Sequence, residues 1–219
     1  NSAGFAAGNW IFDQDSIQIN QAEVIWLDQY KETSEHHIQI ESLHLKNKWF
    51  NHKINLTFHS PWNTGLAKVD ARFKHHMFGN AGNWNDWNGL TNWDITNIDL
   101  RKVNRLIDGR INVVDGTMTT KGNAYLNSGM LDGGQTDIQL SNLHFEWDRL
   151  GQPLKIMSLQ AQILQDTYGR KMTISAPQLN WQLDRKSPKQ ELNDLSLYWK
   201  AAPNINSVEH AGIKALKIN

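Results

Sequence analysis

The sequence has no cysteine and no surplus of charge of either sign. Its 219 residues contain 22 lysines and arginines against 22 aspartates and glutamates, which gives a formal net charge of zero. A chain without cysteine has no disulfide framework, no thiolate nucleophile and no cysteine-based zinc site. A chain without a basic surplus lacks the charge that a nucleic-acid groove uses to displace counterions. We therefore expect neither nucleic-acid binding nor cysteine chemistry.

Long apolar runs and catalytic motifs are also missing. No stretch approaches the roughly 20 apolar residues of a membrane-spanning helix, and no signal-peptide pattern is found. No G-x-S-x-G, P-loop or dinucleotide-binding fingerprint occurs. The histidine pairs at 36–37 and 75–76 would point to opposite faces of a strand, so they are interpreted as surface residues rather than as metal ligands. We expect no enzyme, no cofactor and no metal.

The sequence does contain an alternating strand pattern that skips once. Apolar residues lie at Ile138 and Leu140, and then at Leu143 and Phe145, so two residues instead of one separate the halves. Strand side chains alternate between faces with a period of two. One extra residue would turn the second half over unless the backbone bulges. We therefore expect a bulge between Leu140 and Leu143.

The same skip recurs along the chain. It is found at 17–26, 38–45, 154–163, 174–183, 192–199 and 211–218. Neighbouring strands that bulge at the same level curl around their apolar face. The predicted fold is mainly β: a long, curved, bulged antiparallel sheet whose apolar face forms a groove. The alternatives are unrelated bulges, the corners of a β-sandwich, or an apolar face that packs on a second sheet or on a helix.

Residues 1–130 are less regular than the strand repeats at 131–219. Strands are expected at 54–58 and 67–73, followed by a Trp-rich loop at 79–94. One short helix is expected at 100–107, with Asp99 as its N-cap and Gly109 as its stop. Two strands are expected between this helix and the repeats. The chain begins without Met and ends inside an alternating pattern, so we interpret residues 1–219 as a single fragment of a larger protein.

Inward-facing positions of the repeats are the candidate site. Tryptophans at the ends of several repeat strands continue the aliphatic pattern, which favours a core or the rim of a groove. The residues predicted to line the groove are Ile17, Ile19, Val24, Trp26, Ile138, Leu140, Leu143, Phe145, Trp147, Ile156, Leu159, Ile163, Ile174, Leu179, Trp181, Leu183, Leu195 and Leu197.

Five stretches, taken in order, resemble the AsmA-like superfamily of Gram-negative bacteria. They are WIFDQDSIQINQAEVIWLD, IQIESLHLKNKWFNHKINLTFHSP, WNGLTNWDITNIDL, DGRINVVDGTMTTKGNAYLNSG and TDIQLSNLHFEW. The resemblance covers most of residues 9–183 and is nearest to the YhdP branch, with the TamB proteins as more distant relatives. No single motif is strict, so the order of the pieces carries the resemblance.

The resemblance implies a bridge-like lipid transfer protein of the cell envelope. Such a protein is anchored in the inner membrane, crosses the periplasm, and conducts phospholipids along a hydrophobic β groove toward the outer membrane. It thereby supports outer-membrane biogenesis and the permeability barrier. The implied partners are phospholipids and the two membrane surfaces, with no nucleic acid, and the family has no catalytic residues to transfer to this chain.

Other classes of function stay open at this stage. A carbohydrate-binding β-sandwich would use Trp84, Trp87 and Trp93 as an exposed row of indoles for stacking on sugars. An assembly factor for outer-membrane proteins would pair an exposed edge strand with its client. A hydrolase with paired carboxylates is the third alternative.

Overall fold

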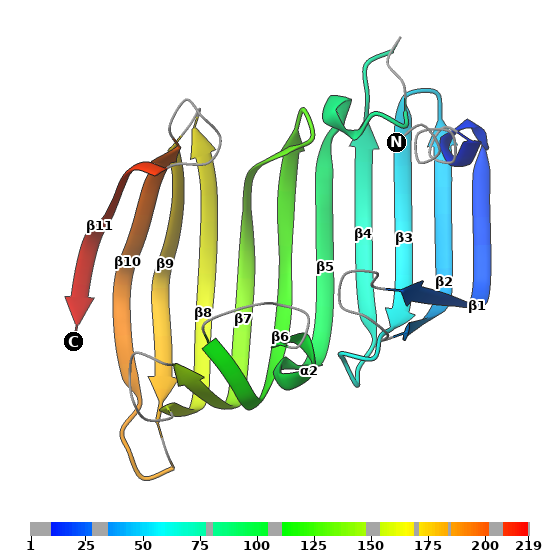
Figure 1. The fold of residues 1–219 in the computed structure, drawn as a ribbon. Coiled ribbons are helices and arrows are strands. Elements are labelled where there is room, and N and C mark those ends of the chain that lie inside the picture. The colour runs from blue at the N-terminus through cyan, green and yellow to red at the C-terminus, as the bar shows by residue number, and fades with distance from the viewer. Residues whose placement is uncertain are drawn as a thin grey trace. The chain divides into compact units, whose positions relative to one another are not determined.

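The computed structural model is mainly β, and its strands form one antiparallel sheet in which each strand pairs with the next along the chain (Figure 1). It describes residues 10–27, 35–77, 81–104, 111–147, 154–168, 171–183, 185–201 and 208–218. The strands are β1 (Ser16–Leu27), β2 (Glu35–Lys48), β3 (Asn51–His59), β4 (Ala67–Lys74), β5 (Asn88–Asp99), β6 (Ile111–Asn127), β7 (Met130–Trp147), β8 (Leu154–Tyr168), β9 (Lys171–Gln182), β10 (Gln190–Ala201) and β11 (Val208–Ile218). The prediction of a mainly β, antiparallel fold is confirmed. Among the described residues, no helix has the length and hydropathy to cross a membrane.

The chain divides into two compact units. Unit 1 comprises residues 1–95 and 123–132, and unit 2 comprises residues 96–122 and 133–219. Strands β1 to β4 belong to unit 1, and β8 to β11 belong to unit 2. Strands β5, β6 and β7 contribute residues to both.

The skips in the sequence coincide with irregular positions in the strands. Asn142 of β7 has φ 52°, Gln21 of β1 has φ 56° and Asp194 of β10 has φ 59°, and each is the second of the two skipped residues. In β7 the exposed pair Ser141 and Asn142 separates the half-buried Leu140 and Leu143. The predicted change of parity is therefore confirmed, and it takes place at a residue in the left-handed region.

In the pairs β1–β2 and β9–β10, the two strands carry their extra residues opposite each other, whereas β2 shifts its register against β3 at Glu41. Asn20 pairs with Ser42 and Ala22 pairs with Ile40, so Gln21 faces Glu41. In unit 2, Gln178 pairs with Asn193 and Ala176 with Leu195, so Pro177 faces Asp194. Both strands of such a pair change parity together, and their apolar side chains stay on one face.

The short helix begins where the sequence predicts it. Helix α2 spans Leu100–Asn104, and the backbone N–H of Lys102 donates to Asp99 Oδ1 over 3.2 Å, which is the expected N-cap. The predicted end of the helix at 107 and its stop at Gly109 lie outside the described residues.

Three sequence-based boundaries are wrong. The expected loop at 79–94 ends early, because β5 begins at Asn88 after the short 3₁₀ turn η1 (Trp84–Asp86). The two strands expected within 111–127 are one strand, β6, because Gly116 adopts φ 142° and absorbs the bend inside the strand. Leu183 follows β9, which ends at Gln182.

Candidate functional site

Apolar side chains of unit 1 line up in rows on one face of its sheet. The rows are Ile17, Leu45, Ile54, Ala71; then Ile19, Leu43, Leu56, Val69, Trp93; and then Ala22, Ile40, Phe58, Ala67, Ile95. The opposite face carries polar rows, of which one is Gln18, His44, Asn55, Asp70, Asn92. The sheet of unit 1 is therefore amphipathic, as an antiparallel sheet with two different environments requires.

This apolar face is only half covered. Leu45, Ala67 and Ala71 are buried, whereas the larger aliphatic side chains beside them are half-buried and Val24 is 43% exposed. Among the described residues no large side chain is fully buried. In the part of the chain that the structure describes, neighbouring side chains of the same layer shield these residues, and no second layer covers them.

Unit 2 repeats this arrangement. Its rows are Ile138, Ala161, Leu179, Leu192; then Leu140, Leu159, Trp181; and then Leu143 with Ile156. Phe145 pairs with Leu154, and Leu195 pairs with Ala176. Most of these side chains are half-buried, while Leu183 and Leu197 are 45% and 39% exposed.

Most of the predicted lining residues whose side chains are described therefore lie in apolar rows of the sheet. The exceptions are Leu183, which lies beyond its strand, and Ile163, which pairs with Thr136 of β7 and sits at the register shift between β8 and β9. Trp26, Trp147 and Ile174 lie in strands, but their side chains are outside the described ones. Whether these rows contact a lipid stays a prediction.

A pocket of about 370 Å³ opens beside Asn142, at the skip of β7 in unit 2. Its apolar part comes from Leu143, Ile156 and Met157, and Lys155 and Arg185 provide cations at its border. Helix α2 packs at the same level, because a Cβ on Gly116 would lie 3.3 Å from Leu143 Cδ1 and 3.4 Å from Leu100 Cδ1. At Leu143 the apolar face is thus partly covered by this helix, as one of the alternatives expected.

An aromatic cluster closes one end of the apolar face in unit 1. The His52 ring lies 4.8 Å from Phe12, 5.1 Å from His75 and 5.9 Å from Trp87, measured between centroids. Trp87 also packs on Phe73 at 5.0 Å. These rings come from β3, from β4 and the segments that follow it, and from a helical turn at residues 10–13.

Asn47 fixes the tautomer of His52 within this cluster. The Asn47 amide donates to the carbonyls of Ile11 and Gln14, so its Oδ1 accepts from His52 Nδ1 over 2.8 Å. His52 Nε2 is then an acceptor, buried without a hydrogen-bond partner. Burial, followed by repulsion from His75, lowers the pKa of His52 from 6.5 to about 4. His52 is therefore neutral at pH 7 and packs in the aromatic cluster without a charge.

Two of the three tryptophans expected to form a sugar-binding row, Trp87 and Trp93, have described side chains. The Trp87 indole donates to the Ala81 carbonyl over 3.0 Å and packs inside the aromatic cluster. Trp93 lies in β5 opposite Val69, on the apolar face. The side chain of Trp84 is outside the described ones. The two indoles that are described therefore occupy separate environments.

Two parts of this site lie outside the sequence-based predictions. The predicted lining contains no residue of β2 to β5, although 38–45 carries the skip and Leu56 and Val69 alternate without one. The aromatic cluster was also not predicted, because histidine is not an apolar residue type. Its signal was present, since His52 continues the alternation of Ile54 and Leu56.

Comparison with known proteins adds no relative, since no family model, curated protein or solved structure matches the chain. Within the described segments, no group of three histidine or carboxylate side chains is placed to hold a metal ion. The apolar rows are therefore the feature on which a functional proposal rests.

Proposed function

We propose that the chain is a segment of an AsmA-like conduit, and that its apolar face shields phospholipid acyl chains during their passage through the periplasm between the inner and outer membranes. The observation that carries this proposal is the set of half-exposed aliphatic rows in both units. A soluble protein rarely leaves so continuous an apolar surface without an occupant.

The dimensions of the rows suit an acyl chain. The row from Ile19 to Trp93 crosses four strand-to-strand spacings, which amounts to about 19 Å. The hydrocarbon core of a bilayer is about 30 Å thick and holds two opposed chains. One chain therefore spans about 15 Å, and a single row could cover it.

The energetic benefit is distributed rather than local. Each CH₂ group that stays out of water contributes about 0.8 kcal/mol, so a two-chain lipid gains most from an apolar wall without gaps. Leu, Ile, Val and Trp side chains provide such a wall without directional bonds. The paired skips would curl the strands around it and form the groove. Catalysis, nucleotides and metals have no part in this mechanism.

The lipid content of the purified chain tests the proposal. Gentle purification followed by lipid extraction and mass spectrometry should recover phospholipid from the wild type. Leu56→Glu places a charge in the centre of an apolar row and should remove most of that lipid. Thr57→Glu is the matched control, because Thr57 is the next residue of β3, pairs with Lys68 and points to the polar face. It should retain the lipid.

Brominated phospholipid gives a second readout in the same proteins. It should quench the fluorescence of Trp93, and Leu56→Glu should abolish that part of the quenching. A folded Leu56→Glu variant with wild-type lipid content and quenching would refute the proposal. Quenching by oligosaccharides in place of lipid would favour the carbohydrate-binding alternative.

A further inference from the structure

The polar face of unit 1 carries two adjacent rows of cations at one end of its strands. Lys46 pairs directly with Lys53, and Lys53 pairs directly with Arg72. In the next row, Lys48 and Lys74 flank Asn51 on β3. Like charges directly opposite each other destabilise a sheet. We call these five exposed cations the basic belt.

Within the described part of unit 1, no carboxylate forms a salt bridge with any of the five cations of the basic belt. The salt-bridge contacts of that part join histidines to carboxylates elsewhere, such as His37 to Glu23 and His59 to Glu41. The acid on this face of β4 is Asp70, which accepts a hydrogen bond from Asn55 and not from Arg72. The sheet therefore retains a repulsive arrangement that an anionic ligand would relieve.

A pocket lies among these cations. It has a volume of about 270 Å³ and is lined by the cations Lys46, Lys48, Lys53 and Arg72, together with Asn51, His52 and Phe73. One water molecule occupies about 30 Å³ in the liquid, so the pocket has room for a phosphate group. Lysine ammonium groups and the fork of an arginine are the donors that phosphate oxygens favour.

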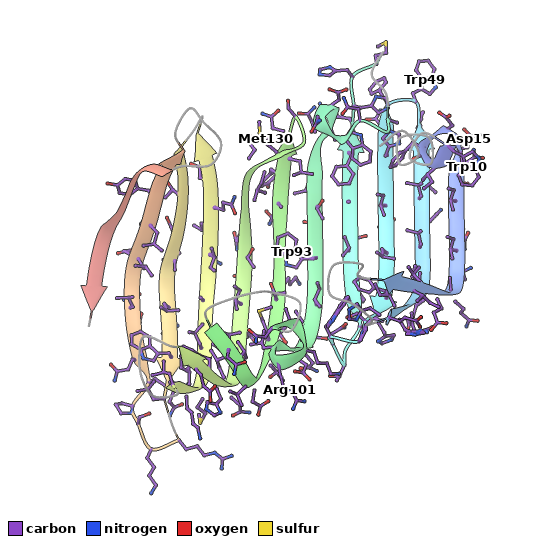
Figure 2. All side chains as sticks on the ribbon, in the orientation of Figure 1. Trp10, Asp15, Trp49, Trp93, Arg101 and Met130 are labelled. Atoms are coloured by element: carbon purple, nitrogen blue, oxygen red, sulfur yellow. The ribbon has the colours of Figure 1, made fainter. Side chains whose placement is uncertain are left out.

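Exposed apolar side chains project from the same end of unit 1. Trp49 forms the tip of the turn between β2 and β3 and is 83% exposed, while Trp10 and Met130 are 63% and 71% exposed (Figure 2). Met77, just beyond β4, is 63% exposed. The Met130 turn belongs to this end, because the Gly129 N–H donates to the Trp87 carbonyl over 2.9 Å.

Trp49 also holds a costly backbone conformation. Its φ is 56°, in the left-handed region that a bulky residue rarely adopts. Glycine or asparagine would suit this turn better. An exposed indole held in a strained turn, next to Lys48, indicates that Trp49 contacts a partner, because backbone strain is typically kept where it serves a function.

We propose that this end of unit 1 docks on the surface of an anionic phospholipid bilayer. The basic belt binds lipid phosphates, and Trp49, with the apolar side chains near it, enters the interfacial layer where indole rings are favoured. The belt lies on the face opposite to the apolar rows, so this site is distinct from the surface that would hold acyl chains. A nucleic acid fits less well, because the chain as a whole has no basic surplus. Trp10 and Trp49 offer surfaces on which bases can stack, so competition by an oligonucleotide tests that alternative.

Vesicle flotation of the full chain tests the docking site. Wild type should bind vesicles that contain phosphatidylglycerol and should not bind vesicles of phosphatidylcholine alone. One cation near an anionic membrane contributes about a fivefold change in binding, so Lys53→Gln with Arg72→Gln should weaken binding about 25-fold. Lys68→Gln is the matched control, because Lys68 lies on the same face of β4 but opposite Asp94. It should bind like the wild type.

Trp49 and soluble anions provide the decisive comparisons. Brominated phosphatidylglycerol should quench wild-type fluorescence more than that of Trp49→Phe. Equal quenching, or unchanged binding by the Lys53→Gln, Arg72→Gln protein, would overturn the proposal. Competition by millimolar inorganic phosphate or by a short oligonucleotide would also overturn it, in favour of a soluble anion. Leu56→Glu should still bind these vesicles, which separates this result from the fate of the acyl-chain proposal.

Discussion

Strands with and without a skip solve the same problem in different ways. In unit 1, β3 and β4 pair without interruption from Asn51 with Lys74 to Phe58 with Ala67. In unit 2, β9 and β10 pair on both sides of a skip where Pro177 faces Asp194. Both pairs keep their apolar side chains on one face. A strand can therefore contain an extra residue in two ways. Its partner can contain one at the same level, as in β9 and β10, or the register can shift at a bulge, as where Glu41 of β2 has no partner in β3.

The chemistry of the skipped residues explains why these positions are tolerated. Gln21, Asn142 and Asp194 take positive φ values, and of these the asparagine and aspartate are among the residues that enter that region at the lowest cost. Pro177 has no backbone N–H to contribute to a ladder, so a bulge is one of the few places in a sheet that accepts it. The skip is thus encoded by residue types as well as by the apolar pattern.

Removing a skip residue should produce the largest effect. Deletion of Asn142 would turn Leu143 and Phe145 to the polar face of β7 and bring His144 to the apolar face. Each misplaced large apolar side chain costs about 1.5–3 kcal/mol, and a misplaced polar group adds about 1–3 kcal/mol. Leu143 and Phe145 are half-buried, so about half of the apolar cost applies to each. We expect a loss of about 2.5–6 kcal/mol in the free energy of unfolding of unit 2, measured by denaturant titration and hydrogen exchange.

Asn142→Gly is the control for that deletion, because it keeps both the residue count and the positive φ. It should change stability by less than about 1 kcal/mol. If the deletion and the glycine variant have similar stability, the skip does not set the parity of β7, and the contrast with β3 loses its meaning.

Acid should distinguish the aromatic end of unit 1 from unit 2. The pKa of folded His52 is about 4, below its ordinary value of 6.5. The neutral ring therefore favours folding fully above pH 6.5, and this contribution is lost as the pH falls from 6.5 to 4. At about 1.4 kcal/mol for each pKa unit, the loss is of order 3 kcal/mol. Hydrogen exchange at pH 7 and pH 4.5 should show it in β3 and β4.

His52→Phe should remove this part of the pH dependence, since the ring stays aromatic but no longer titrates. His37→Gln is a matched control, because His37 is exposed and paired with Glu23. An unchanged acid response in His52→Phe would mean that other groups destabilise unit 1 in acid.

Local rules predicted the strands and their parity, but long-range packing decided the rest. Alternation located β7 to β10 and the skip at Asn142, and a capping residue located the start of α2 at Asp99. The prediction of a loop at 79–94 was wrong at its end. Glycine and asparagine favour turns locally, but Gly89 belongs to β5, where it lies so close to Arg72 and Phe73 of β4 that a side chain would not fit. The basic belt could not be predicted from the sequence, because Lys46, Lys53 and Arg72 come together only through the pairing register of β2, β3 and β4.

The smallest predicted effect is that of a glycine substitution, which should stabilise unit 1 in a strand with a skip and destabilise it in a strand without one. Gln21→Gly relieves a left-handed residue in the skip of β1 and should raise the free energy of unfolding by a few tenths to about 1 kcal/mol. Thr57→Gly in the uninterrupted β3 adds backbone entropy to the unfolded state and removes a half-buried β-branched side chain, so it should lower the free energy of unfolding by about 1 kcal/mol. Denaturant midpoints of the two variants measure both. If both substitutions destabilise unit 1 equally, the positive φ of Gln21 carries no strain, and residue type has no part in placing the skip.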